Sequence, residues 1–320
     1  MPTLRQLLKV NQALTLVGVL MLATLLGTFV GLLVDPRVIT GAPAWLKPAK
    51  FALSSSIYAF TFVWLLGFVR GHPRLVAISA NTVAAALVIE VGIICLQVVR
   101  GTTSHFNYAT PLDGVLFSIM ALVIVVLWLM SVMAAVLLIR QRLPDAAFAW
   151  SLRLGLLIAL VGMAVAFFMP QPTPDQRAAL SAGAAWTTIG AHSVGVADGG
   201  PGLPIVGWST VGGDLRVAHF FGLHALQVLP FIGWLLARRP SLGARQRLLL
   251  VWTSGLAYLG LVVILTWQAL RGQSVIAPDP TTLAAFGVLV GSVCLGYGVQ
   301  RWQPSRGTAD IVRDGLRPAA

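Results

Sequence analysis

Residues 112–139 of this chain read "LDGVLFSIMALVIVVLWLMSVMAAVLLI". The one charged residue of this run, Asp113, lies at the start, and the rest of the run is almost continuously apolar. An α-helix needs about 20 such residues to cross the hydrocarbon core of a bilayer. A membrane β-strand would instead alternate polar and apolar residues over shorter segments. Residues 112–139 are therefore predicted to form a transmembrane helix.

Similar apolar runs occur along the whole chain. They predict an all-α, polytopic integral membrane bundle of about eight transmembrane helices. The first run follows Arg5 and Lys9 and is longer than the apolar region of a signal peptide, so we expect an uncleaved span. The predicted spans lie near residues 11–34, 51–69, 75–98, 112–139, 147–169, 217–237, 247–270 and 282–300.

The composition agrees with a membrane protein. Hydrophobic residues make up 57% of the 320 residues and charged residues only 10%, whereas soluble domains carry about 25% charged residues. A net charge of +12 would suggest nucleic acid as the partner of a soluble protein. Here the cations lie mostly in short loops between apolar runs, as membrane topology requires. We therefore expect the lipid bilayer as a partner and no nucleic acid; the sequence does not set the oligomeric state.

The distribution of Lys and Arg predicts the orientation. With the N-terminus inside, the inner loops carry 14 of these residues and the outer loops 7. Cytoplasmic loops of membrane proteins carry an excess of Lys and Arg. Both termini are therefore expected in the cytoplasm, and the chain in a bacterial inner membrane.

Two stretches suggest an internal duplication. "QVVRGTTS" (97–104) and "QALRGQSV" (268–275) both read Gln, two residues, Arg-Gly, at an offset of 171. Phe51 and Trp64 are 13 residues apart, and so are Phe221 and Trp234, at an offset of 170. We predict two tandem four-helix halves, 1–145 and 146–320, related by an axis along the membrane normal. Chance recurrence in apolar sequence is the alternative.

The second half carries an extra outer loop at about 170–216. Its stretch 195–214 holds seven glycines, and loops of this length are usually functional or disordered. No G-x-G-x-x-G, P-loop or G-x-S-x-G motif is present. We expect a folded cap over the outer mouth of the bundle, with an unstructured loop as the alternative.

Four of the five histidines fall in outer segments, and two of them stand at the mouth of the sixth span. A spacing of five residues puts His219 and His224 about 140° apart on a helix, which disfavours a shared metal. Gln227 shares a helix face with His224. A metal ion such as zinc, iron or copper, or one b-type haem, would need donors from several spans. The candidates are His105, His219 and His224, with Glu90 or Asp214; hydrogen bonding across helices is the alternative.

Apart from Asp113 at the very start of its run, Glu90 is the only acidic residue inside a predicted span, and it lies near the outer end. Ionisable groups at membrane depth are costly and mark functional or paired positions. Gln97 lies seven residues on and shares the same helix face. Without a partner the Glu90 carboxyl would favour its neutral form and could carry a proton. With a partner it would be structural.

The outer loops also carry cations that the orientation makes unexpected. They could together bind a phosphate, a carboxylate or a lipid headgroup; alternatively each extends alone to the interface. "RGTTSHFN" (100–107) adds hydroxyl, His and Asn side chains to the same face. The candidate anion-binding residues are Lys47, Lys50, Gln97, Arg100, Asp214, Arg216, Gln227 and Arg271.

These features favour an inner-membrane protein with an outward-facing polar site that binds an anionic ligand, a metal or a haem. It would be a membrane enzyme or redox protein, with Glu90, His105 and His224 as the candidate catalytic residues. A proton-coupled small-molecule transporter is one alternative, with Glu90 as its proton site. A membrane sensor or assembly factor without catalysis is the other.

Overall fold

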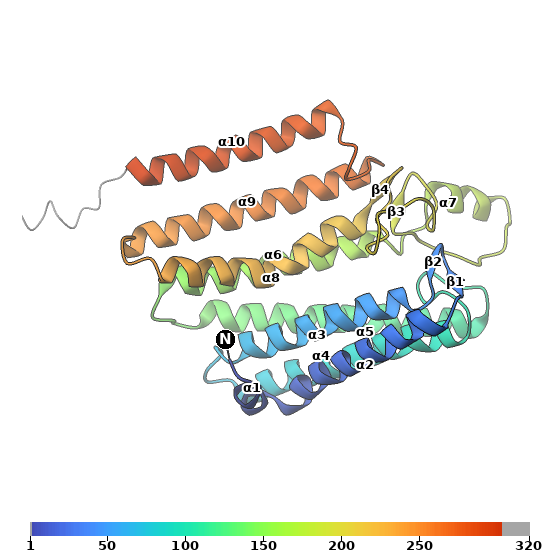
Figure 1. Cartoon of the computed structure of the whole chain (residues 1–320), viewed down its shortest axis with the longest axis horizontal. Coiled ribbons are helices and arrows are strands. Elements are labelled where there is room, and N and C mark those ends of the chain that lie inside the picture. Colours follow the sequence, from blue (N-terminus) through green and yellow to red (C-terminus); the bar gives the residue numbers. More distant parts are fainter. Residues whose placement is uncertain (1, 303–320) are drawn as a thin grey trace, which may run out of the picture.

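The computed structural model describes residues 2–302 and is an all-α membrane bundle. Within this range eight helices are long and apolar enough to cross a membrane, and they lie side by side along one common direction (Figure 1). The predicted fold class is confirmed. The helices are α2 (Gln12–Val34), α3 (Leu46–Leu66), α4 (Pro73–Val99), α5 (Pro111–Arg140), α6 (Ala146–Val165), α8 (Leu215–Ala237), α9 (Ala244–Leu270) and α10 (Pro280–Trp302).

Local chemistry explains where these helices begin. The Asn11 side chain accepts a hydrogen bond from the Leu14 amide at the start of α2. Thr110 caps α5 in the same way, and Pro111 follows at the first helical position, where its missing N–H is harmless. A short helix that the hydropathy pattern did not predict, α1 (Leu4–Val10), precedes α2.

One end of the bundle carries the long connections, and we call it the loop end (at the right in Figure 1). The connection between α2 and α3 holds the hairpin of β1 (Val38–Ile39) and β2 (Ala42–Pro43). Residues 169–214, here called the cap, follow the 3-10 turn η1 (Ala166–Phe168) and are folded. They contain α7 (Pro174–Ser181) and an antiparallel pair, β3 (Ser193–Val194) and β4 (Gly213–Asp214).

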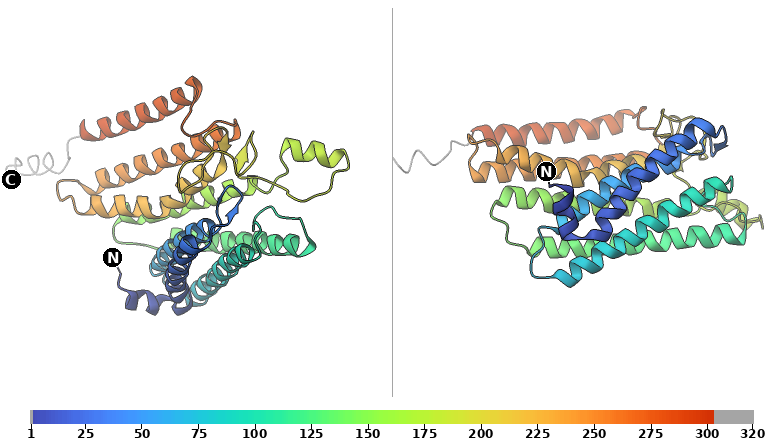
Figure 2. Two further views of the ribbon diagram at one scale, coloured as in Figure 1. Left: turned by 45° about the vertical axis from the view of Figure 1, so that its right-hand side comes forward. Right: turned by 60° about the horizontal axis from the view of Figure 1, so that its bottom comes forward.

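The helices form two groups that share one core. In the first group α2 packs against α3 and α4, and α4 packs against α5; in the second, α6 packs against α8 and α9, and α9 against α10. Figure 2 shows the groups on opposite sides, joined where α5 meets α6. Phe62 of α3, Leu127 of α5, Leu156 of α6 and Leu226 of α8 belong to a single buried cluster. The groups are therefore packed together through the middle of the bundle.

Helices α6 and α8 approach each other most closely at Gly162 and Gly222. A Cβ atom built on Gly162 would lie 2.5 Å from the Gly222 Cα atom, far inside van der Waals contact. Glycines allow two helix backbones to meet at such a distance, a common device in membranes. The contact sets the register of α8 and hence the level of its histidines.

Substitution of Gly222 by Val is expected to destabilise the bundle by about 1–3 kcal/mol, because overpacking forces the helices apart. The measurement is the free energy of unfolding in detergent. Gly92→Val on α4 is the matched control, since no atom lies within 4 Å of its Cβ position. Equal stability of the two variants would contradict the close crossing.

Candidate functional site

Three residues predicted from sequence converge at the loop end. Lys47 lies in the first turn of α3, Glu90 lies on α4, and His105 lies in the connection between α4 and α5. The His105 Nε2 atom is 3.7 Å from Glu90 Oε1. The charge of Lys47 acts on both side chains. These contacts form the core of a buried polar site.

His105 is held by aromatic rings and a hydroxyl. Its ring meets Phe51 edge-on at 5.5 Å between centroids and Phe106 at 5.9 Å. Its Nδ1 atom is 3.0 Å from the Ser104 hydroxyl. Burial, followed by the nearby charges of Lys47 and His192, lowers the pKa of His105 well below 6.5. The ring is therefore neutral at pH 7 and does not act as a counter-charge for Glu90.

Glu90 is buried with half of its carboxyl group unused. The residue is 4% exposed. Within the described chain its Oε2 atom has no hydrogen-bond partner, and its Oε1 atom faces the neutral His105. A buried polar atom without a partner is costly and calls for a functional or structural reason.

The cap adds His192 and Asp198 to the site. Asp198 Oδ2 lies 2.6 Å from His192 Nδ1, and the same carboxylate accepts the backbone N–H groups of His192 and Ser193 at 3.0 and 2.9 Å. The His192 ring stacks on His105 at 6.1 Å with an interplanar angle of 30°. We name Lys47, Glu90, His105, His192 and Asp198 the central cluster.

The Asp198–His192 pair has a defined protonation pattern. Burial alone would raise the pKa of Asp198, but the hydrogen bonds from His192 and from backbone amides outweigh it and lower the pKa. Burial also lowers the pKa of His192, with Asp198 opposing. An ionised Asp198 accepts the proton carried by Nδ1, so we assign the free lone pair of His192 to Nε2.

The predicted residues Lys50, Asp214 and Arg216 fasten the cap to the helices. Arg216 donates to Asp214 at 2.9 and 2.5 Å and to the Gly207 carbonyl at 2.6 Å. Lys50 donates to the Val206 carbonyl at 3.0 Å. These bonds hold residues 206–207 against the starts of α3 and α8, beside the central cluster.

Three other predicted residues serve the helix ends. Arg100 Nη1 donates to Gln97 Oε1 at 2.5 Å and to Asp113 Oδ1 at 2.6 Å, and Gln97 donates to the same Asp113 oxygen. Arg271 pairs with Asp279 at 2.6 Å. Each of these two arginines is thus neutralised by a carboxylate at the start of the next helix.

The histidines of α8 lie elsewhere, between helices. His219 Nδ1 is 2.8 Å from the Gly162 carbonyl, beside the glycine crossing. His224 contacts Gln227 at 3.2 Å, and Gln227 donates to Thr61 of α3 at 3.1 Å. No group of three His, Cys, Asp or Glu side chains in residues 2–302 could hold a metal ion. The binding of a metal ion or a b-type haem therefore remains a prediction from sequence. Residues 2–302 contain no cluster of three such donors that would support it.

Sequence reasoning did not select His192 and Asp198 as site residues. A signal was present, because "HSVGVADG" places a histidine and a carboxylate six residues apart around glycines. Gly195 and Gly199 have φ of +80° and +89°, values that favour glycine. These turns fold the segment back so that the carboxylate reaches the histidine.

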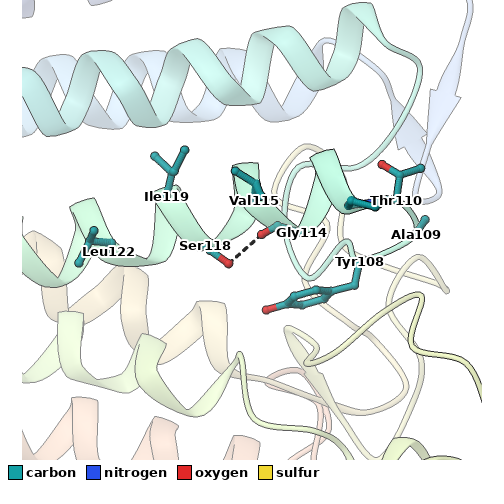
Figure 3. A pocket seen from close by; sticks show the side chains of 9 residues that line it. Tyr108, Ala109, Thr110, Gly114, Val115, Ser118, Ile119 and Leu122 are labelled. Atoms are coloured by element: carbon teal, nitrogen blue, oxygen red, sulfur yellow. Dashed lines mark hydrogen bonds between the residues drawn. The ribbon is translucent and has the colours of Figure 1, made fainter.

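A groove of about 640 Å³ lies beside this site, along the first turns of α5 (Figure 3). Nine residues between positions 108 and 122 line it, and none of them is charged. Val115, Ile119 and Leu122 give it an apolar floor. The ring of Tyr108 packs on Phe117 at 5.7 Å. The groove is a feature of the apolar surface and lacks the charges of the central cluster.

Comparison with known proteins found no similarity. No protein-family model, no curated protein and no solved structure matches the chain. The function must therefore be argued from the site itself.

Replacement of His105 by Gln is expected to flatten the pH dependence of stability. Below about pH 6.5 the unfolded chain protonates this histidine while the folded chain does not, so wild-type stability falls as pH falls. The difference in unfolding free energy between wild type and variant should shift by about 2 kcal/mol from pH 7.5 to pH 5. Denaturant titrations at both pH values measure it.

The control is His72→Gln, at the exposed N-cap of α4, where the side chain makes no capping hydrogen bond. That variant should keep the wild-type pH profile. An unchanged profile in His105→Gln would show that His105 titrates normally in the folded protein.

Proposed function

We propose that this membrane protein binds a small anion, a carboxylate or a phosphate, at the central cluster. The supporting observation is the state of Lys47. Among the described residues its ammonium group makes no hydrogen bond and no ion pair within 4.0 Å, although it acts electrostatically on the whole cluster. Lysine is a common phosphate ligand and acts there as a point charge.

The other cations of the loop end support this choice by contrast. Each of them is already engaged by a carboxylate or a backbone carbonyl: Arg37, Lys50, Arg100, Arg177, Arg216 and Arg271. Lys47 is half-buried, so an anion beside it would be partly shielded from water and bound more strongly than at an exposed lysine.

Catalysis at the same position is compatible with this geometry. Asp198 orients His192 as carboxylates orient catalytic histidines, and the assigned Nε2 lone pair can accept a proton from a ligand or from water. The proposed catalytic residues are therefore His192, His105 and Glu90. His224, predicted from sequence, lies instead in the contact between α8 and α3.

The proposed location is the outer face of a bacterial inner membrane, with both termini in the cytoplasm. The excess of Lys and Arg in the loops at the opposite end of the bundle supports this orientation.

We also propose that the two halves, 1–145 and 146–320, are tandem copies. The order of helix packing is the same in both groups. In the turns after α4 and α9, the Gln97 carbonyl accepts from the Thr102 amide and the Gln268 carbonyl from the Gln273 amide, at 3.0 and 3.2 Å. Gly101 and Gly272 have φ of +75° and +72°.

The tandem halves favour transport as a second candidate function. Substrate sites of transporters lie where repeats meet, and the central cluster joins side chains of α3 and α4 to side chains of the cap. The contact of Gln227 with Thr61 places further polar groups between α8 and α3. Uptake of labelled sulfate into proteoliposomes, lost in Lys47→Met, would support transport over binding alone.

Lys47→Met is expected to weaken anion binding at least about tenfold, because the cation of the central cluster is removed while the stem keeps its packing. Isothermal titration of the detergent-solubilised chain with sulfate, acetate and inorganic phosphate measures the effect. Lys9→Met, an exposed lysine near the N-terminus, is the matched control and should bind as the wild type does.

Failure of the wild type to bind any of the three anions would contradict the proposed function. So would equal binding by the Lys47 and Lys9 variants, because the anion would then be held by general surface charge.

A further inference from the structure

We infer that anion binding beside Lys47 is coupled to protonation of Glu90, so that one proton is taken up for each anion bound. This inference rests on the proposed anion site. It adds to that site a second partner, the proton, and a residue that carries it.

The first step concerns the charges that face Glu90. On the connection between α4 and α5 it faces His105, which is neutral at pH 7. Lys47 lies one turn before Phe51 on α3, and the Phe51 ring meets His105 at 5.5 Å, so the charge of Lys47 acts on Glu90 from that side. Where Glu90 is ionised, Lys47 is therefore the cation that stabilises it.

The second step concerns the charges that face Lys47. Apart from Glu90 these are Asp198, Arg216 and Lys50. Asp198 is engaged by His192 and two backbone amides, and Arg216 is paired with Asp214 at 2.5 Å. Lys50 donates to a backbone carbonyl. Glu90 is thus the one acid of the cluster without a cationic or amide donor of its own.

The third step is the exchange of partners. An anion that binds Lys47 supplies the negative charge that Glu90 supplied before. The Glu90 carboxylate is then buried beside a second negative charge, with Oε2 already unpartnered. Both burial and a like charge favour the neutral acid. The carboxylate therefore takes one proton from hydronium at the loop end and becomes a carboxylic acid, leaving water.

His105 lies on the path of this proton. Its Nε2 atom is 3.7 Å from Glu90 Oε1, and its Nδ1 atom contacts the Ser104 hydroxyl. His192 stacks on His105 and, like Lys47, is a rival proton carrier, so the experiment must separate both from Glu90.

Sulfate is the probe, because it does not change protonation state between pH 5 and 9. The full chain in detergent is titrated calorimetrically across this range, in buffers of different ionisation enthalpy. In the pH range where Glu90 is ionised, we expect one proton to be taken up per sulfate bound. In that range the affinity for sulfate should fall about tenfold for each unit by which the pH rises. In Glu90→Gln, sulfate should bind with no such slope and without proton uptake. Asp175→Asn, an exposed acid on α7, should keep the wild-type slope.

A second measurement detects the protonated carboxyl group directly and does not depend on a change in sulfate affinity. Addition of sulfate to the wild type should produce the infrared carbonyl band of a protonated carboxyl group, and Glu90→Gln should lack it. The proton count of the wild type tests the coupling even where the variant folds poorly.

The outcomes are distinct. Sulfate binding that depends on Lys47 but takes up no proton overturns the coupling and leaves the anion site standing. Proton uptake that persists in Glu90→Gln overturns the assignment and moves the proton to His192 or to the amine of Lys47. Absence of sulfate binding in the wild type overturns the proposed function and this inference together.

Discussion

The structure depends on the rule that backbone polar groups in lipid must be hydrogen-bonded within the chain. Eight helices meet this rule by themselves, each with its own ladder of hydrogen bonds. The long irregular connections lie at the ends of the bundle. The cap therefore occupies the loop end, and the site that it covers lies there as well. The same rule explains why side chains such as His219 and Gln227 bond to groups on neighbouring helices instead of remaining free.

The cap and the helices depend on each other. A bridge between Asn107 and Thr188 joins the connection after α4 to the cap, and the Lys50 bond to Val206 joins the cap to α3. Below it, the contact of Gly162 with Gly222 holds α6 and α8 together. The central cluster is thus assembled from α3, α4, one short connection and the cap, on a base where the two helix groups share one core.

Charge placement gives the site its chemistry. Described cations at the loop end other than Lys47 are engaged by a carboxylate or a backbone carbonyl, and Glu90 holds a buried carboxylate oxygen without a partner. An unpaired ionisable group at membrane depth costs free energy, and such groups usually mark functional positions. Because the two exceptions act on each other, they define one ligand site together. The flanking Asp198–His192 pair adds a group that can exchange protons with whatever binds.

Length and apolarity are local properties, so the membrane class and the helices follow from the amino-acid pattern alone. Glu90, Lys47 and His105 also stand out in that pattern, since an ionisable group in or beside an apolar span is visible without a fold. Which of these residues meet depends on how the helices pack. His192 and Asp198 reach the site because glycine turns fold the long cap over the helices. Arg100 and Arg271 do not contribute to the site, because they pair with Asp113 and Asp279. Those partnerships depend on how segments distant in sequence approach in space, and no local pattern encodes that approach.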